Sequence, residues 1–385
     1  MYGLSHPQRV VADQDDISSY SFVACITYAA PLSTSVAGAR RLWSMPSPAP
    51  LAVRVGTRAS TLALTQTGLV AAQLARSPAL AVELVRITTD GDRLTGSLVD
   101  IGGTGVFVSA LRDALLSGRC DVAVHSLKDL PTGPAAGIAM AAIPERADPR
   151  DALCARDGLT LAGLPAGARV GTGSPRRAAQ LLAARPDLEV VDIRGNVDTR
   201  LHRVAPGDLD AVVLAAAGLA RLGRLDAVTD LLALTVVSPS PGQGALAVEA
   251  RASDVADAGS ALALALAALD HAPSRLAVTA ERALLARLEA GCAAPVGAHA
   301  RVKDGLLVLD AVVCRPNGTA QLRRTLAHPL PAPAPDPAQT RGCGTSGAKG
   351  VVAERLQVAG QLGADLADLL LADGAAELAG LGAVR

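Results

Sequence analysis

The sequence has few aromatic residues and no excess of either charge. Its 385 residues include one Trp, three Tyr and two Phe, and 36 Lys and Arg residues balance 36 Asp and Glu residues. Aliphatic side chains must therefore fill the cores. The balanced charge argues against a general nucleic-acid binder, which would carry a basic excess. The length allows two or three domains.

Metal, nucleotide and export signals are also missing. The six cysteines form no C-x-x-C pair, so we expect neither a disulfide framework nor a metal site. The P-loop and G-x-G-x-x-G patterns are absent. The uncharged stretch 17–39 follows acidic residues and contains Ser, Thr and Pro, unlike a signal peptide or membrane span. We expect a cytoplasmic protein, in which residues 1–50 are a disordered extension or follow from a start assigned upstream of Met45.

From residue 51 onward, apolar strand-like runs alternate with helical stretches. This pattern predicts an α/β fold with doubly wound parallel sheets. We expect domain 1 at 51–147 and 240–268, domain 2 at 148–239, and domain 3 at 270–385 with two strands and a flexible Pro/Gly-rich loop at about 328–350. Two lobes joined by two crossings leave a cleft at the carboxyl ends of the strands, where open α/β sheets bind ligands.

Basic residues gather where predicted strands end, several of them beside glycine. They are Arg58, Lys128, Arg176, Arg177, Arg194, Arg200 and Arg221. One such arginine is commonly solvated surface, but this set favours an anion site, because guanidinium groups grip carboxylates with two bonds. Arg176 and Arg177 open a helix, where the dipole disfavours cations, so we expect an anion between them. Without a nucleotide motif, carboxylates fit best.

Two further residues have local sequences that leave alternatives open. Asp129 follows an apolar strand in "HSLKDLP", where it can stabilise a positive charge in the cleft or cap the turn before Pro131. Cys292 lies among small residues in "LEAGCAAPVG", where it can be a nucleophile, a cofactor attachment point or a structural thiol.

Several ordered motifs together resemble one family. "VGTRASTLALTQ", "DVAVHSLKDLP", "VGTGSPRRAAQL", "PGQGALAVE" and "LEAGCAAPVGAHA" are similar to segments of the hydroxymethylbilane synthase (porphobilinogen deaminase) family, from about residue 53 to the C-terminus. The resemblance implies two doubly wound lobes like type II periplasmic binding proteins, plus a small α/β C-terminal domain. It also implies a monomeric, metal-free transferase. Such an enzyme joins four porphobilinogen molecules head to tail with loss of ammonia, and water releases the linear tetrapyrrole hydroxymethylbilane.

The resemblance assigns roles to matching positions. It implies a dipyrromethane cofactor joined to Cys292 by a thioether, and Asp129 as the catalytic carboxylate. Cofactor carboxylates would be bound by Lys128, Ser174, Arg176, Arg177 and Arg200. The incoming substrate would meet Arg58, Ser60, Arg194, Arg200 and Gln243, with Arg221 assisting elongation and Phe107 in a lid.

Two other readings remain. A non-catalytic carboxylate-binding protein of the periplasmic-binding type would need neither Asp129 nor Cys292. An enzyme-like relic would bind without turnover. In none of these readings do we expect a nucleic-acid or membrane partner.

Overall fold

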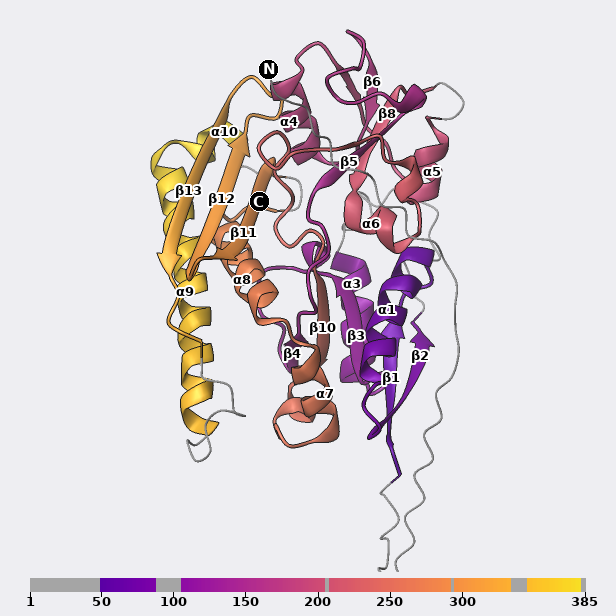
Figure 1. Cartoon of the computed structure of the whole chain (residues 1–385), viewed down its shortest axis with the longest axis vertical. Coiled ribbons are helices and arrows are strands. Elements are labelled where there is room, and N and C mark those ends of the chain that lie inside the picture. The colour runs from indigo at the N-terminus through magenta and orange to yellow at the C-terminus, as the bar shows by residue number, and fades with distance from the viewer. Residues whose placement is uncertain (1–48, 88–104, 205–207, 292–293, 334–344, 382–385) are drawn as a thin grey trace, which may run out of the picture. The chain divides into compact units, whose positions relative to one another are not determined.

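The first of three sheets is five-stranded and mixed (Figure 1). The computed structural model describes residues 49–87, 105–204, 208–291, 294–333 and 345–381. The strand order is β2-β1-β3-β10-β4, with β1 parallel to β2 and β3, and β10 antiparallel to β3 and β4. The elements are β1 (Leu51–Thr57), α1 (Thr61–Leu74), β2 (Leu80–Arg86), α3 (Gly105–Leu116), β3 (Val122–Ser126), β4 (Ile138–Ala142), β10 (Leu246–Arg251) and α7 (Ala261–Leu269).

The second sheet repeats this plan with strand order β7-β6-β8-β5-β9. Strand β6 is parallel to β7 and β8, whereas β5 is antiparallel to β8. The elements are β5 (Asp151–Ala155), β6 (Arg169–Gly171), α4 (Pro175–Ala184), β7 (Glu189–Val191), α5 (Val197–His202), β8 (Ala211–Ala215), α6 (Ala216–Arg221) and β9 (Asp230–Leu231). The predicted α/β fold is confirmed, but each of the two sheets is mixed rather than parallel. Each sheet takes in a strand that arrives by a crossing and runs against its neighbours.

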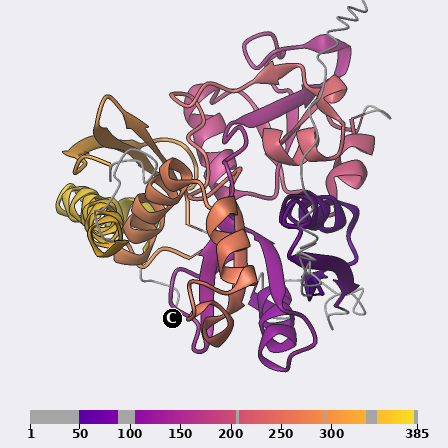
Figure 2. The ribbon, with the colours of Figure 1, turned by 60° about the horizontal axis from the view of Figure 1, so that its bottom comes forward.

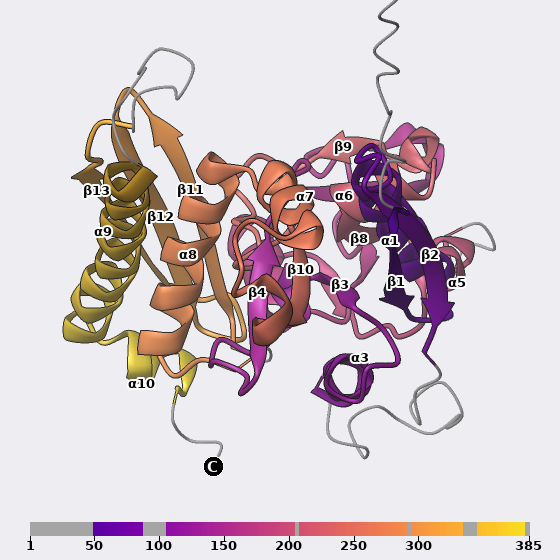
Figure 3. The ribbon, with the colours of Figure 1, turned by 90° about the horizontal axis from the view of Figure 1, so that it is seen from below.

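The third sheet is antiparallel, in the order β11-β12-β13, and helices α8 and α9 pack on it (Figure 3). The elements are α8 (Ala272–Arg287), β11 (Val296–Lys303), β12 (Leu306–Cys314), β13 (Gln321–Pro329), α9 (Thr345–Ala372) and α10 (Ala375–Ala379). Only two strands were expected here. Strand β13 is an edge strand of this sheet, in which Leu322 and Leu326 pack against the core while Arg324 is exposed.

The loop predicted at about 328–350 is shorter at both ends in the structure than in the prediction. Residues 328–329 belong to β13, and residues 345–350 form the start of α9. Residues 334–344 lie outside the described part of the chain, as do residues 1–48 of the expected extension. Among the described residues, no single helix is long and apolar enough to cross a membrane. The bent pair α7 and α8 passes that test only when taken together.

Helices α1 and α4, which lie next to the cavity described below, each begin with a side-chain N-cap. Ser60 is the N-cap of α1 and accepts a hydrogen bond from the Ala63 N–H. Ser174 is the N-cap of α4, where Pro175 occupies the first turn. Such caps satisfy backbone N–H groups that have no partner within the helix. Both helices therefore begin at defined positions just beyond β1 and β6.

The chain crosses between the first two sheets twice, and the crossings touch. The colours in Figure 2 follow this excursion from the first sheet to the second and back. The Ala147 N–H donates to the Gly244 carbonyl at 3.3 Å. Gly244 has φ +87°, and a Cβ there would lie 2.5 Å from the Ala147 oxygen. Only glycine fits this close approach without strain.

One buried carboxylate ties both crossings to the third sheet. Glu281, on α8, accepts hydrogen bonds from Arg146 Nη1 on the first crossing and from the Gly242 N–H on the second, each at 2.6 Å. Its Oε1 also accepts the Ala300 N–H of β11 at 2.7 Å. Since its side chain is fully buried, this carboxylate has no water to replace these donors.

We expect Glu281→Gln to lower the free energy of unfolding by about 3–5 kcal/mol, because Arg146 would be left buried without its counter-charge. Chemical denaturation followed by circular dichroism measures this loss. The matched control is Asp368→Asn, which breaks the exposed pair between Asp368 and Arg287 of the same helix α8. It should cost less than about 1 kcal/mol. Equal losses in the two variants would show that Glu281 has no special structural role.

Candidate active site

A cavity of about 610 Å³ opens where segments of the first and second sheets meet. It is lined by the start of α1, the end of β3, parts of α5, β8 and α6, and the second crossing. Five cations line it, Arg58, Lys128, Arg177, Arg200 and Arg221, against two carboxylates, Asp129 and Asp198. The lining is therefore positive, which suits a ligand with several negative charges.

Asp129 and Lys128 reach this cavity from one tight turn after β3. Leu127, Lys128 and Asp129 form a single 3₁₀ turn, closed by the Leu130 N–H donating to the Leu127 carbonyl at 3.0 Å. Leu127 is buried and anchors the turn, while its two charged neighbours are half-buried. Asp129 lines the cavity. Among the described residues, no hydrogen bond to its carboxylate is found, so the capping alternative has no support there.

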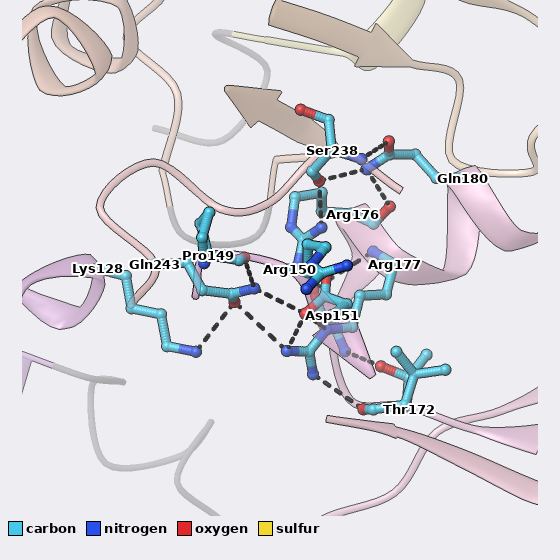
Figure 4. A network of polar contacts seen from close by, with 12 residues as sticks. Lys128, Pro149, Arg150, Asp151, Thr172, Arg176, Arg177, Gln180, Ser238 and Gln243 are labelled. Atoms are coloured by element: carbon cyan, nitrogen blue, oxygen red, sulfur yellow. Dashed lines mark hydrogen bonds and ion pairs between the residues drawn. The ribbon is translucent and has the colours of Figure 1, made fainter. Parts of the chain in front are cut away.

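Asp151, at the start of β5, binds the two adjacent arginines of α4 (Figure 4). Its Oδ2 accepts from Arg176 Nη2 at 2.8 Å, and its Oδ1 accepts from Arg177 Nε at 3.0 Å. Burial raises the pKa of Asp151, but the charges of Arg176 and Arg177 outweigh it and hold the pKa at about 2. The anion that the helix start requires is thus supplied by the protein itself.

The side chains of Arg176 and Arg177 point in different directions. Arg177 lines the cavity and also donates to the Val213 carbonyl at 3.0 Å. Arg176 points away from the cavity and donates to the Ser238 carbonyl on the second crossing. Ser174 caps the helix beneath them and is not among the lining residues. Of the three predicted cofactor contacts in this motif, the structure brings only Arg177 to the cavity surface.

The remaining predicted basic residues divide in the same way. Arg58, Arg200 and Arg221 line the cavity, as do Ser60 and Gln243. Arg200 Nε donates to the Gly195 carbonyl at 2.8 Å, and Arg221 Nη2 donates to the Gly244 carbonyl at 2.6 Å. Arg194 is exposed, lies outside the lining and pairs with Asp192 at 3.1 Å.

The side chains of two predicted residues lie outside the described part of the structure. Cys292 lies outside the described residues, between α8 and β11. Phe107 belongs to the first turn of α3 rather than to the preceding loop, and its side chain is likewise not described. Among the described cysteines, Cys120, Cys154 and Cys314 are buried, and burial raises the pKa of each thiol to about 11. Those three are therefore structural thiols.

Sequence reasoning missed several polar residues that line the cavity, including His125 and Asp198, and it missed Asp151, which lies behind the lining. Asp151 precedes the apolar run "ALCA" and read as an ordinary strand start. Its signal was a carboxylate entering a strand that is otherwise fully apolar. His125 lines the cavity, and its Nε2 lies 3.2 Å from Oε2 of the buried Glu249. A histidine within the apolar run "VAVHS" was the only hint of it.

Among the described lining cations, Lys128 has a pKa that is lowered toward neutral pH. Burial, together with the charge of Arg177, lowers its pKa from 10.5 to about 8. The nearby carboxylates Asp129 and Asp151 oppose this shift without cancelling it. An anion bound in the cavity would favour the charged form and raise the pKa again.

Comparison with known proteins identifies the family. A family model described as "Porphobilinogen deaminase, dipyromethane cofactor binding domain" matches residues 53–258, and one described as "Porphobilinogen deaminase, C-terminal domain" matches residues 275–348. The chain belongs to the porphobilinogen deaminase family. The porphobilinogen deaminase of Leifsonia xyli subsp. xyli is 58% identical over 334 residues, covering 87% of this chain and 96% of the relative. That of Micrococcus luteus is 51% identical over 359 residues, covering 85% and 94%.

The first family model, whose description names a dipyromethane cofactor, spans the elements from β1 to β10. A solved structure, the periplasmic VFT2 domain of Bordetella pertussis BvgS, aligns with a TM-score of 0.34 at 17% identity. The alignment covers 57% of this chain and 88% of the VFT2 domain chain.

We expect Lys128→Met to stabilise the ligand-free protein at pH 7. The folded-state pKa of Lys128 is about 8, below its ordinary 10.5, so the unfolded chain binds this proton more tightly. The stability of the wild type therefore rises with pH between about 8 and about 10.5, and the advantage of the variant should shrink across that window. Denaturant unfolding at several pH values tests this. Lys303→Met, at an exposed lysine, should show no such pH-dependent difference.

Proposed function

We propose that this chain condenses four porphobilinogen molecules head to tail and releases hydroxymethylbilane by hydrolysis, on a dipyrromethane held by Cys292. Each condensation breaks the C–N bond of the aminomethyl group and releases ammonia. The methylene carbon then joins the free ring carbon of the preceding pyrrole, which loses its proton. The observation that carries this proposal is Asp129, a carboxylate facing a cavity with five cations.

The residues of the cavity fit a dipyrromethane group. Its two pyrrole rings carry four carboxylates, and Lys128, Arg177 and Arg200 line the cavity with charge of the opposite sign. These three side chains would hold the carboxylates. When bound, the group supplies the pyrrole carbon to which the first substrate is joined. Arg176 and Ser174 would contribute indirectly, by placing the first turn of α4.

The other residues orient the substrate and stabilise its charge. Asp129 would stabilise the positive charge on the pyrrole ring as ammonia leaves, an effect of about 2–4 kcal/mol for one well-placed group in a partly dry site. Arg58 and Ser60, at the start of α1, would bind substrate carboxylates together with Gln243, and Arg221 would assist elongation. Arg194 and the Phe107 lid remain predictions of substrate contact.

We also propose that the enzyme acts as a monomer in the cytoplasm, with porphobilinogen and water as its only reactants. The competing function, carboxylate binding without catalysis, would use the same cations. That function would give no role to the Asp129 carboxylate, which lies among these cations. Measuring covalent modification and turnover separates the two functions.

The decisive experiment is the intact mass of the purified protein, measured beside Cys292→Ala after incubation with porphobilinogen. We expect the wild type to be heavier by two condensed pyrrole units and the variant to be unmodified. Cys120→Ala, at a buried thiol, is the matched control and should gain the same mass as the wild type. An unmodified wild type would contradict the proposal and favour a binding protein or an inactive relative.

We expect Asp129→Ala to fold and to gain the same mass increment slowly or not at all. Its turnover should fall at least about a hundredfold, because Asp198, the other described carboxylate of the lining, is already paired with Arg224. Hydroxymethylbilane formation and thermal melting measure the two properties. Glu189→Gln, at an exposed carboxylate, should leave both unchanged. Near-normal turnover in Asp129→Ala would refute its catalytic role.

A further inference from the structure

Lysine is rare in this chain, and one lysine faces the cavity. Of the 36 Lys and Arg residues, only Lys128, Lys303 and Lys349 are lysines. Lys128 Nζ donates to Gln243 Oε1 at 3.4 Å, and Arg177 Nη2 donates to the same oxygen at 3.5 Å. Both contacts are long for hydrogen bonds to a charged donor. The two cations thus converge on a neutral acceptor that holds them weakly.

Asp151 sets the direction of that acceptor. Gln243 Nε2 donates to Asp151 Oδ1 and to the Pro149 carbonyl, each at 2.8 Å (Figure 4). With the amide nitrogen held on that side, the amide oxygen must point toward Lys128 and Arg177. Asp151 Oδ1 also binds Arg177 directly. A single carboxylate oxygen therefore orients both cations, one by contact and one through an amide.

We propose that Asp151 is a positioning residue that aims Lys128 and Arg177 at one carboxylate of the bound acidic ligand. This inference rests on the proposed function, because the ligand it implies is a pyrrole carboxylate. Asp151 supplies one negative charge to a cluster in which Arg176, Arg177 and Lys128 supply three positive charges. The cluster keeps an unbalanced positive charge at the cavity surface, and the long contacts to Gln243 are readily exchanged for shorter ones to a carboxylate.

Among the described residues, four charged groups have the largest effects on Lys128. They are Asp129 on its own turn, Asp151 on β5, and Arg176 and Arg177 on α4. Removing the charge of Asp151 leaves two arginines opposed only by Asp129, so the ammonium of Lys128 becomes harder to maintain. Gln243 carries no charge, so a shift of the Lys128 titration when Gln243 is replaced reports the amide that links Asp151 to Lys128 rather than the loss of a nearby charge.

The test follows the three lysines by NMR in protein labelled with ¹³C at lysine Cε, assigned by Lys303→Arg and Lys349→Arg. We expect Asp151→Asn to lower the titration midpoint of Lys128 by about one pH unit. It should also slow the gain of two pyrrole units from porphobilinogen about tenfold or more. Asp187→Asn breaks an Asp–Arg pair on the surface of the second sheet and should change neither.

Gln243→Leu covers the case in which Asp151→Asn does not fold, since it leaves the Asp151 ion pairs intact. It too should lower the Lys128 midpoint and slow the mass gain about tenfold. An unchanged Lys128 midpoint in the folded variants overturns the positioning role, whether or not the wild type gains mass. If the wild type gains no mass but the midpoint still moves, the proposed function fails and the positioning of Lys128 and Arg177 stands.

Discussion

A buried carboxylate paired with two adjacent arginines is the interaction on which the cavity depends. Arg176 and Arg177 are 4% and 5% exposed at the start of a helix, where desolvation and the helix dipole both disfavour them. Asp151 compensates this cost with bonds to both guanidinium groups. Because it neutralises one charge and not two, the remaining charge is available at the cavity surface through Arg177.

Gln243, whose side chain is oriented by Asp151, also belongs to the junction with the third sheet. The backbone carbonyl of Gln243 accepts Arg146 Nε at 2.8 Å, and Arg146 is paired with Glu281 of α8. The side chain of Gln243 is held by Asp151. Backbone and side chain of one residue thus join two buried ion pairs. A shift of α8 would therefore reach Gln243 at the cavity through the hydrogen bonds from Glu281 to Arg146 and from Arg146 to Gln243.

Sequence reasoning reached the fold class and most of the cavity, and its failures have physical causes. The alternation of apolar runs identifies strands and helices, but the direction of β10 and β5 depends on crossings that no local pattern encodes. Strand β13 was missed because an edge strand buries only alternate side chains, such as Leu322 and Leu326, among exposed polar residues. Short-range patterns do not distinguish such a strand from a loop.

At the cavity, the limit was orientation rather than residue type. Glycine-flanked basic residues predicted where cations gather, but neighbours on a helix point about 100° apart, so Arg177 reaches the surface and Arg176 the interior. Asp151 was missed because its partners lie 25 and 26 residues away in the sequence. The sheet brings Asp151 and the two arginines together by placing β5 against β8. Arg177 also donates to the Val213 carbonyl in β8.

Three of the five cavity cations share a property that bears on how a growing, highly charged chain passes through the cavity. Arg177 is bonded to Asp151, Arg200 to the Gly195 carbonyl, and Arg221 to the Gly244 carbonyl. Each already has a protein acceptor, so a carboxylate that departs does not leave a buried donor unsatisfied. A ligand held by such cations gains less binding energy per contact than one held by unpartnered charges. It can therefore exchange one site for the next at low cost, which is what repeated condensation on one cofactor requires.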